Sequence, residues 1–191
     1  MILCGVDEAG RGPWAGPVVA AAVILPPAGA PAGAGDSKTL TAQKRARLET
    51  LIQQSCVWAI GEASVEEIDR LNIRQATHLA MRRAVEGLAT SPALALVDGN
   101  DAPRLPCPVR TIIGGDATEP AIACASILAK EHRDRLMVAA CALYPGYGFA
   151  RHKGYGSPEH QRALAEIGPC PLHRLTFKPV AASQRSAASP K

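Results

Sequence analysis

The chain of 191 residues has few aromatic side chains, which make up 4% of its composition. Its apolar fraction of 47% must therefore come mainly from Ala, Val, Ile and Leu. The charged fraction of 20% is ordinary for a globular protein, and this balance excludes disordered, collagen-like and coiled-coil chains. The length predicts one compact domain with room for a small helical appendage.

The sequence lacks a C-x-x-C pair although it has six cysteines, which argues against a zinc ribbon or a redox motif. Unpaired cysteines of this kind are typical of a reducing cytosol, so we expect a cytoplasmic protein. No secretory signal is apparent, because Asp7 and Glu8 precede any apolar core of useful length. The apolar run Val18–Leu25 is bounded by prolines and is much shorter than the roughly 20 residues of a membrane span. We interpret it as a strand.

The chain also has little net charge, only +4, which by itself argues against a nucleic-acid binder. The average conceals an asymmetry, because residues 101–191 carry 12 Lys and Arg against 7 Asp and Glu. The basic excess is concentrated from Arg151 onward, where the only acidic residues are Glu159 and Glu166. A local basic patch of this kind can bind a polyanion even when the whole chain is nearly neutral.

The apolar pattern predicts an α/β sheet domain over residues 1–143, followed by a helical segment over 144–180 and a disordered tail over 181–191. Five short apolar runs are predicted strands: 2–6, 18–25, 57–64, 94–97 and 109–113. Helical periodicity or helix-start signals mark four segments: 41–54, 66–88, 119–143 and 158–167. The first has a basic solvent face at Lys44, Arg45 and Arg47. Asn72 is a candidate break in the second, and Thr118 is the expected N-cap of the third.

Acidic residues lie where three of these strands stop. Asp7 and Glu8 follow the first strand, Asp98 follows the fourth and Asp116 follows the fifth. Taken singly, each has an ordinary explanation: a solvated strand end, the Asp98-Gly99 turn signal, or a charge that favours a helix N-terminus. Together they favour a site, because strand ends of one open sheet converge on the edge where α/β proteins bind ligands.

A cluster of carboxylates must shift its pKa values or bind cations. Oxygen-only ligands suit Mg²⁺ or Mn²⁺, and two such ions about 4 Å apart are a recurring device for phosphodiester hydrolysis. Adjacent strand residues face opposite ways, so Asp7 and Glu8 reach one ion only if the strand bends, which Gly10 would permit. Asp134 is a rival ligand, but it lies four residues after Lys130 and is better explained as a helical ion pair.

Two further stretches suggest nucleic-acid contacts. The turn Gly10-Arg11-Gly12 does not fit a dinucleotide fingerprint, but its bare backbone could approach a 2′-hydroxyl while Arg11 meets a phosphate. In residues 151–156, Lys153 could contact a phosphate and Tyr155 could stack on a base or sugar, with a solvated loop as the alternative. We expect the histidines of this region to be structural or exposed rather than catalytic: His152, His160 and His173.

At this point the sequence resembles the ribonuclease HII family, the prokaryotic type 2 ribonucleases H. The similarity extends in the family's order from residue 5 to about 178. It is carried by eight stretches: 5–17 (GVDEAGRGPWAGP), 36–38 (DSK), 97–100 (VDGN), 115–116 (GD), 122–130 (IACASILAK), 133–137 (RDRLM), 152–156 (HKGYG) and 173–174 (HR). Cys124 and Glu131 depart from the usual pattern, at positions outside the predicted chemistry.

The resemblance implies a ribonuclease H-like fold: a mixed five-stranded sheet flanked by helices, with a C-terminal helical segment. It implies cleavage of RNA in RNA–DNA hybrids and 5′ of single ribonucleotides in duplex DNA, with two Mn²⁺ or Mg²⁺ ions. The implied catalytic and metal-ligating residues are Asp7, Glu8, Asp98 and Asp116. Substrate contacts carry over to Gly10, Arg11, Gly12, Lys38, Lys153 and Tyr155, and Ser126 is a supporting position.

We therefore expect RNA–DNA hybrid and ribonucleotide-containing duplex as binding partners, and a monomer. No membrane partner is expected, and no recognisable clamp-binding peptide ends the chain. Two alternatives stay open: a nuclease of the same fold that needs no ribonucleotide, and a catalytically silent hybrid-binding module. Cleavage of an all-DNA duplex would favour the first alternative. Binding without Mg²⁺- or Mn²⁺-dependent cleavage would favour the second.

Overall fold

Five strands form one mixed sheet in the order β3-β2-β1-β4-β5. The second strand, β2, pairs antiparallel with both β1 and β3, whereas β1, β4 and β5 run parallel to one another. This confirms the predicted mixed five-stranded sheet. The structure, a computed structural model, describes residues 1–35 and 40–187. The strands are β1 (Leu3–Ala9), β2 (Val18–Ile24), β3 (Val57–Ala63), β4 (Leu94–Asp98) and β5 (Val109–Ile112).

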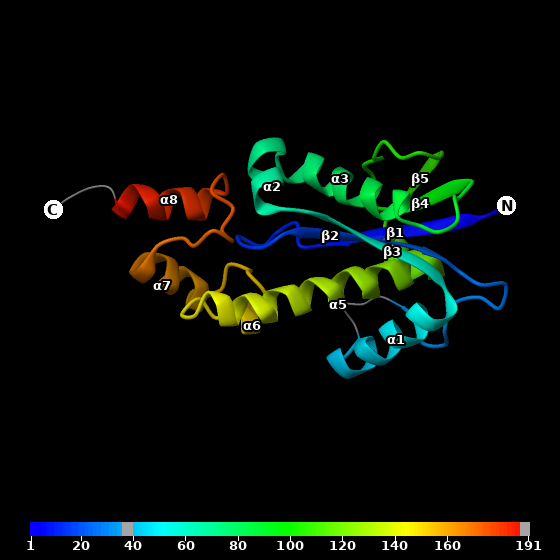
Figure 1. The fold of residues 1–191 in the computed structure, drawn as a ribbon, viewed down its shortest axis with the longest axis horizontal. Helices are drawn as coiled ribbons and strands as arrows, with labels where there is room; N and C mark the ends of the chain where they lie inside the picture. The colour runs from blue at the N-terminus through cyan, green and yellow to red at the C-terminus, as the bar shows by residue number, and fades with distance from the viewer. Residues whose placement is uncertain (36–39, 188–191) are drawn as a thin grey trace.

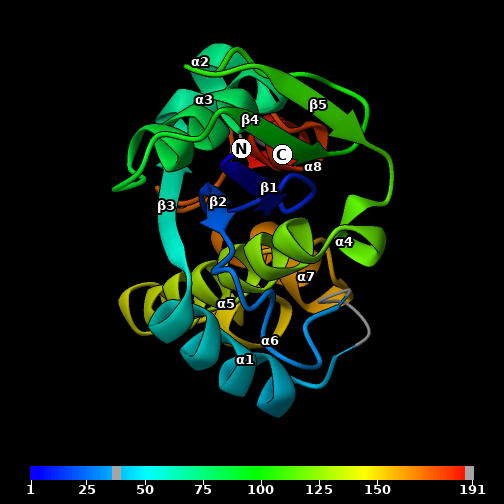
Figure 2. The same ribbon diagram turned by 90° about the vertical axis from the view of Figure 1, so that its right-hand side faces the viewer.

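Helices cover both faces of the sheet, and more helices continue beyond one end of it (Figure 1). Figure 2 shows α2 and α3 on one face and α5 with α1 on the other. Within the described residues the helices are α1 (Ala42–Ser55), α2 (Val65–Leu71), α3 (Ile73–Glu86), α4 (Gly115–Thr118), α5 (Pro120–Leu143), α6 (Phe149–His152), α7 (Pro158–Ile167) and α8 (Lys178–Ala187). None of them is long and apolar enough to cross a bilayer.

The core has one apolar layer on each face of the sheet, as two-sided α/β packing requires. Small side chains let the helices lie close: a Cβ on Gly5 would be 2.1 Å from the carbonyl carbon of Ala121 in α5. On the other face, a Cβ on Gly61 would be 2.1 Å from the carbonyl oxygen of Ala80 in α3. The shortage of aromatic residues is thus compatible with a tight core, because alanine and glycine bring backbones into contact.

Two predicted helix starts have different outcomes in the structure. The predicted break at Asn72 is present, because this residue has a φ of 70° and its side chain accepts a hydrogen bond from the backbone N–H of Gln75. The prediction of Thr118 as N-cap of the long helix is wrong. Residues 115–118 form the separate short helix α4, and Glu119 occupies the N-cap position before Pro120.

The predicted disordered tail is also wrong for residues 181–187, which belong to α8. The first turn of α8 is anchored by Val180, whose side chain is fully buried. The amino-acid composition of the tail does not reveal this contact. The preceding segment is fixed to α2, where the carboxylate of Asp69 accepts hydrogen bonds from the backbone N–H groups of Leu175 and Thr176. The C-terminal segment is therefore docked on the sheet domain.

One ion pair joins α1 to α5, and another lies within α5. Arg45 of α1 lies 2.7 Å from the carboxylate of Glu131 in α5, so it does not belong to the exposed basic face predicted for this helix. This pair also gives Glu131, a departure from the family pattern, a structural role. Asp134 pairs with Lys130 at 2.8 Å, which confirms the helical ion pair predicted for it.

Candidate active site

Asp7 lies on the face of β1 that is covered by α5. Gly5, two residues earlier, contacts the backbone of the same helix, and alternation along the strand places Asp7 on that side. Its side chain is 6% exposed, and one oxygen accepts a hydrogen bond from the backbone N–H of Glu8 at 2.7 Å. The hydroxyl of Ser126, on α5, also hydrogen-bonds to this carboxylate. This contact gives Ser126 the supporting place expected of it.

Asp98 lies beside Asp7 because their strands are parallel neighbours in register. Val6 pairs with Val97, and each aspartate is the next residue on its strand. After Asp98 the chain turns at Gly99, whose φ of 93° is a conformation that glycine adopts without strain. Asp7 and Asp98 therefore lie at the same edge of the sheet.

Asp116 is held at the same edge of the sheet by the turn into α4. One carboxylate oxygen of Asp98 accepts a hydrogen bond at 2.7 Å from the backbone N–H of Gly115, the residue before Asp116. Gly114 makes this turn with a φ of 66°. Asp116 is buried, at 8% exposure, in the first turn of α4.

Glu8 faces the opposite side of β1, toward α3, as strand alternation requires. It lines a small cavity of about 80 Å³ together with Asp98, Arg11 and His78. The guanidinium of Arg11 is 3.7 Å from its carboxylate. The strand does not bend between Asp7 and Glu8, since pairing with β2 continues as far as Ala9.

The carboxylates at this edge are electrostatically coupled. Burial raises the pKa of Asp7 well above its usual range, and the negative charges of Glu8 and Asp98 raise it further. Burial also raises the pKa of Glu8, while Arg11 lowers it and Asp98 raises it. A cation placed here would relieve this repulsion, so the donor set has the chemistry that a hard divalent ion requires.

The carboxylates do not surround a common point in this arrangement. Over residues 1–35 and 40–187, no three side chains of His, Cys, Asp or Glu form a group that could hold a metal ion as they stand. The donor type fits a divalent cation, and bringing Glu8 toward the others would require its side chain to leave Arg11. We therefore treat Asp7, Glu8, Asp98 and Asp116 as candidate ligands by chemistry and location.

The Gly10–Gly12 turn lies at the end of β1, where two buried arginines that no local sequence pattern singled out pack against it or hydrogen-bond to it. Arg174 donates hydrogen bonds to the backbone carbonyls of Gly10 and Arg11. Arg133, on α5, donates to the carbonyls of Ala15, Pro17 and Lys153, each at 3.0 Å. Both were visible only as members of the resembling stretches 133–137 and 173–174.

Tyr155 and Lys153 reach the site from the segment after α5. A Cβ on Gly12 would be 3.7 Å from the ring of Tyr155, so the bare glycine and the half-exposed ring lie side by side. The ammonium of Lys153 donates to the carbonyl of Ala150, which turns it back onto its own segment. Lys38, the remaining predicted substrate contact, lies outside the described residues.

Three histidines form a contiguous cluster, called here the histidine stack, next to the backbone of Tyr155, which agrees with the structural role expected for them. His160 and His173 are buried, and their Nε2 atoms are 2.9 Å apart. The ring of His152 stacks on that of His160 at 4.6 Å. His160 also hydrogen-bonds through Nδ1 to the carbonyl of Tyr155. The stack therefore fixes the backbone that carries this tyrosine.

This stack predicts a loss of stability in acid. Burial and the neighbouring His160 lower the pKa of His173 from 6.5 to about 4. The folded protein thus keeps His173 neutral while the unfolded chain protonates it, so its contribution is present above pH 6.5 and is lost as the pH falls toward 4. We expect His173 to reduce the free energy of unfolding by about 2 kcal/mol between pH 7 and pH 5.

Urea unfolding at the two pH values measures this effect. His173→Gln should show a smaller pH dependence than the unmodified chain, even if it is less stable at both values. Gln161→Ala, which changes an exposed residue of α7 without a titratable group, should keep the full dependence. An equal pH dependence in His173→Gln and in the unmodified chain would contradict the assignment.

The sequence is similar to one family over nearly its whole length. The family model of ribonuclease HII matches residues 4–180. Ribonuclease HII of Caulobacter vibrioides (strain NA1000 / CB15N) is 60% identical over 187 residues, which are 97% of this chain and 89% of the relative. Ribonuclease HII of Halorhodospira halophila is 62% identical over 180 residues, covering 92% of this chain and 91% of the relative.

Solved structures with low sequence identity share the fold. Ribonuclease H2 from Pyrococcus horikoshii OT3 superposes with a TM-score of 0.82 at 24% identity, covering 99% of this chain and 100% of the other. Bst-RNase HIII in complex with Mn²⁺ gives a TM-score of 0.68 at 19% identity, covering 98% of this chain and 70% of the other. The family model and the close relatives together establish that the chain belongs to the ribonuclease HII family and is a metal-dependent ribonuclease.

Proposed function

We propose that the protein cleaves the RNA strand of RNA–DNA hybrids and cuts 5′ of single ribonucleotides embedded in duplex DNA. The observation that carries the proposal is the placement of two features at one edge of the sheet. Asp7, Asp98 and Asp116 gather there, and the Gly10–Gly12 turn begins two residues after Glu8. Chemistry and sugar recognition would then act on the same nucleotide.

Divalent cations complete the proposed site. Bst-RNase HIII was crystallised with Mn²⁺, and the carboxylates of this chain fit Mn²⁺ or Mg²⁺ by donor type. When bound, a pair of such ions activates water and neutralises charge on the scissile phosphate. Asp7 is the central candidate ligand because it is adjacent to Glu8 on its own strand and to Asp98 on the next, and the charges of both act on its carboxylate. Glu8, Asp98 and Asp116 are the proposed remaining ligands.

Other residues of the chain orient these groups. The hydroxyl of Ser126 and the backbone N–H of Glu8 hold the Asp7 carboxylate, and the N–H of Gly115 holds that of Asp98. Carboxylates fixed in this way need little reorganisation as charge develops on the phosphate, which favours hydrolysis. In-line attack of water would leave a 5′-phosphate and a 3′-hydroxyl.

Recognition of the ribose is assigned to the Gly10–Gly12 turn and Tyr155. Gly12 has no side chain, so backbone groups of the turn can approach a 2′-hydroxyl, which distinguishes RNA from DNA. The adjacent ring of Tyr155 is 47% exposed and offers a flat apolar surface to the sugar. Arg174 fixes the turn from behind through the carbonyls of Gly10 and Arg11.

Replacing Tyr155 tests this assignment. Tyr155→Ala should raise KM for a single-ribonucleotide duplex by about tenfold, because stacking on an aromatic ring contributes roughly 1–3 kcal/mol. Tyr155→Phe keeps the ring and is the matched control, with kinetics close to those of the unmodified protein. Steady-state cleavage of a labelled duplex gives both constants. An unchanged KM in Tyr155→Ala would remove the ring from the binding surface.

The proposed activity is tested with three duplexes of one sequence: all-DNA, DNA with one ribonucleotide, and an RNA–DNA hybrid. We expect cleavage of the last two in Mg²⁺ or Mn²⁺ and none with a chelator. Asp116→Asn should bind the hybrid but not cleave it, since it loses a candidate ligand without losing the turn or Tyr155. Cleavage of the all-DNA duplex would favour a nuclease that needs no ribonucleotide. Binding without cleavage by the unmodified protein would favour a silent binding module.

A further inference from the structure

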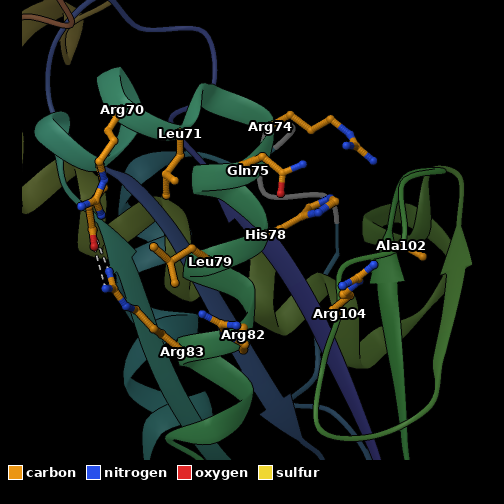
Figure 3. A pocket seen from close by; sticks show the side chains of 11 residues that line it. Arg70, Leu71, Arg74, Gln75, His78, Leu79, Arg82, Arg83, Ala102 and Arg104 are labelled. Carbon is orange, nitrogen blue, oxygen red and sulfur yellow. Dashed lines mark hydrogen bonds and ion pairs between the residues drawn. The ribbon is translucent and has the colours of Figure 1, made fainter.

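A groove rich in arginine runs along the outer side of α2 and α3, outside the carboxylate site. Its volume is about 700 Å³. Figure 3 shows residues of α2 and α3 on one side of it and Arg104, from the segment between β4 and β5, on the other. We call it the arginine groove; its charged and polar lining residues are Glu67, Arg70, Arg74, Gln75, His78, Arg82, Arg83 and Arg104.

The arginine groove concentrates positive charge. Its lining has five arginines and one glutamate. Two further carboxylates, Asp101 and Glu86, pair with lining arginines, which leaves a formal charge of +2. Glu67 is satisfied by Arg83 at 2.7 Å, and Arg74 is paired with Asp101 at 2.6 Å. The exposed side chains of Arg70 and Arg104 have no hydrogen bond or ion pair within the part of the chain that the structure describes. These two guanidiniums are available to an anion.

The groove is continuous with the candidate active site. Arg74 and His78 line both the arginine groove and the small cavity that contains Glu8 and Asp98. A polyanion held at the carboxylates thus has a positively charged path leading away from them. This continuity distinguishes the groove from an isolated basic patch.

The spacing of the α3 side chains suits a nucleic-acid backbone. Arg74, His78 and Arg82 follow each other at intervals of four residues and share one side of the helix. At 1.5 Å per residue they span about 12 Å. One strand of a duplex rises about 3.4 Å per nucleotide, so this row extends along roughly three nucleotides.

We propose that the arginine groove binds backbone phosphates of the substrate duplex on one side of the scissile nucleotide. This inference depends on the proposed function, because it takes the ligand of the groove to be the same duplex that occupies the carboxylate site. Guanidiniums suit phosphate oxygens because they offer planar, paired N–H donors. Such contacts position the duplex without reading its sequence. Arg70 and Arg104 supply the free charges, and Arg74 exchanges Asp101 for a phosphate.

Charge removal with a matched control tests the proposal. The test variant is Arg70→Gln/Arg104→Gln, and the control is Lys44→Gln/Arg47→Gln, which removes the same charge from exposed positions of α1 on the opposite face of the sheet. The probe is an uncleaved all-DNA duplex of about 30 base pairs, and its Kd is measured by fluorescence anisotropy over a range of salt concentrations. This readout does not require cleavage.

For the test variant we expect Kd to rise about tenfold near 0.1 M salt and the slope of log Kd against log salt to decrease by about 2, since each duplex phosphate contact contributes roughly 0.9. The control should behave like the unmodified protein. Equal Kd values and slopes in the test variant and the unmodified protein would overturn the proposal. Equal losses in test and control variants would also overturn it, because they indicate only a nonspecific charge effect.

Cleavage then shows which side of the cut the groove serves. Two long duplexes carry the single ribonucleotide near one end or near the other, so that only one of them extends through the groove. The test variant should raise KM for one duplex and leave the other unchanged, with kcat unchanged for both. An unchanged KM for both duplexes would contradict the proposal that the groove binds the substrate. Failure of the unmodified protein to cut either duplex would contradict the proposed function. The anisotropy measurement would still test whether the groove binds duplex phosphates.

Discussion

Replacing Asp7 by asparagine is expected to lower kcat by at least about 10³-fold while leaving the protein folded. Asparagine keeps the size of the side chain and can accept the hydrogen bonds from Ser126 and the N–H of Glu8. It removes the negative charge that the proposed mechanism needs most, because Asp7 is adjacent to both Glu8 and Asp98. Binding of an RNA–DNA hybrid should change little, since the turn and Tyr155 are unaltered.

The same substitution should stabilise the fold. Burial and the charges of Glu8 and Asp98 raise the pKa of Asp7, which means that the folded protein disfavours its charged form. A neutral side chain removes this unfavourable burial of charge, so we expect the free energy of unfolding to rise by about 1 kcal/mol. Such gains are common where a functional residue lowers the stability of the fold. Asp134→Asn, in the Lys130 pair on α5, is the matched control and should keep full activity. Near-normal kcat in Asp7→Asn would remove Asp7 from the catalytic centre.

Replacing Arg174 by methionine is expected to destabilise the fold by about 3–5 kcal/mol, because a hydrogen bond from a charged donor contributes roughly 1.5–3 kcal/mol and several are lost together. Its guanidinium is fully buried and donates to four backbone carbonyls, those of Gly10, Arg11, Gly16 and Pro17. Methionine fills similar space but donates nothing, so the four carbonyls lose a partner. Burial and the neighbouring Arg133 lower the pKa of Arg174 to about 9, which still leaves it charged at neutral pH.

Urea unfolding of Arg174→Met measures this loss, and Arg162→Met on the exposed side of α7 is the control, expected within about 0.5 kcal/mol of the unmodified protein. Because the lost donors hold the Gly10–Gly12 turn, the folded fraction of Arg174→Met should also discriminate less between ribonucleotide and deoxyribonucleotide duplexes. A change in stability below about 1 kcal/mol would show that water replaces the guanidinium and that the turn holds itself.

The placement of the carboxylates was predictable from the sequence because each lies at the end of an apolar run. The carboxyl ends of two parallel strands lie at the same edge of a sheet. Because Val6 of β1 pairs with Val97 of β4, the residues that follow them, Asp7 and Asp98, lie side by side. The opposite directions of the Asp7 and Glu8 side chains were also predictable, because successive side chains of a strand point to opposite faces of the sheet.

The supporting residues were not predictable in this way because their partners are distant in the chain. Arg133 belongs to a run of charged residues that is typical of a solvated helix face, yet its side chain is buried against carbonyls of the loop after β1. Arg174 similarly reaches more than 150 residues back along the chain. Local pattern carries no information on contacts of this length. The burial of Val180, which anchors α8, was missed for the same reason.

The arginine groove was also hidden from the sequence. Arg70, Arg74 and Arg82 look like the ordinary solvated side of two amphipathic helices. Their relation to the site depends on where β4 ends, because the segment that carries Arg104 leaves from that edge and forms the other wall. The near-neutral total charge therefore concealed a local surface with an excess of arginine.

Mapping the cut site shows whether the carboxylates and the Gly10–Gly12 turn act on one nucleotide. The measurement uses a duplex with a single ribonucleotide, incubated with Mg²⁺ or Mn²⁺, and locates both product ends at nucleotide resolution. We expect one cut, immediately 5′ of the ribonucleotide, leaving a 3′-hydroxyl and a 5′-phosphate. Cuts on the 3′ side, or cuts independent of the ribonucleotide, would contradict it.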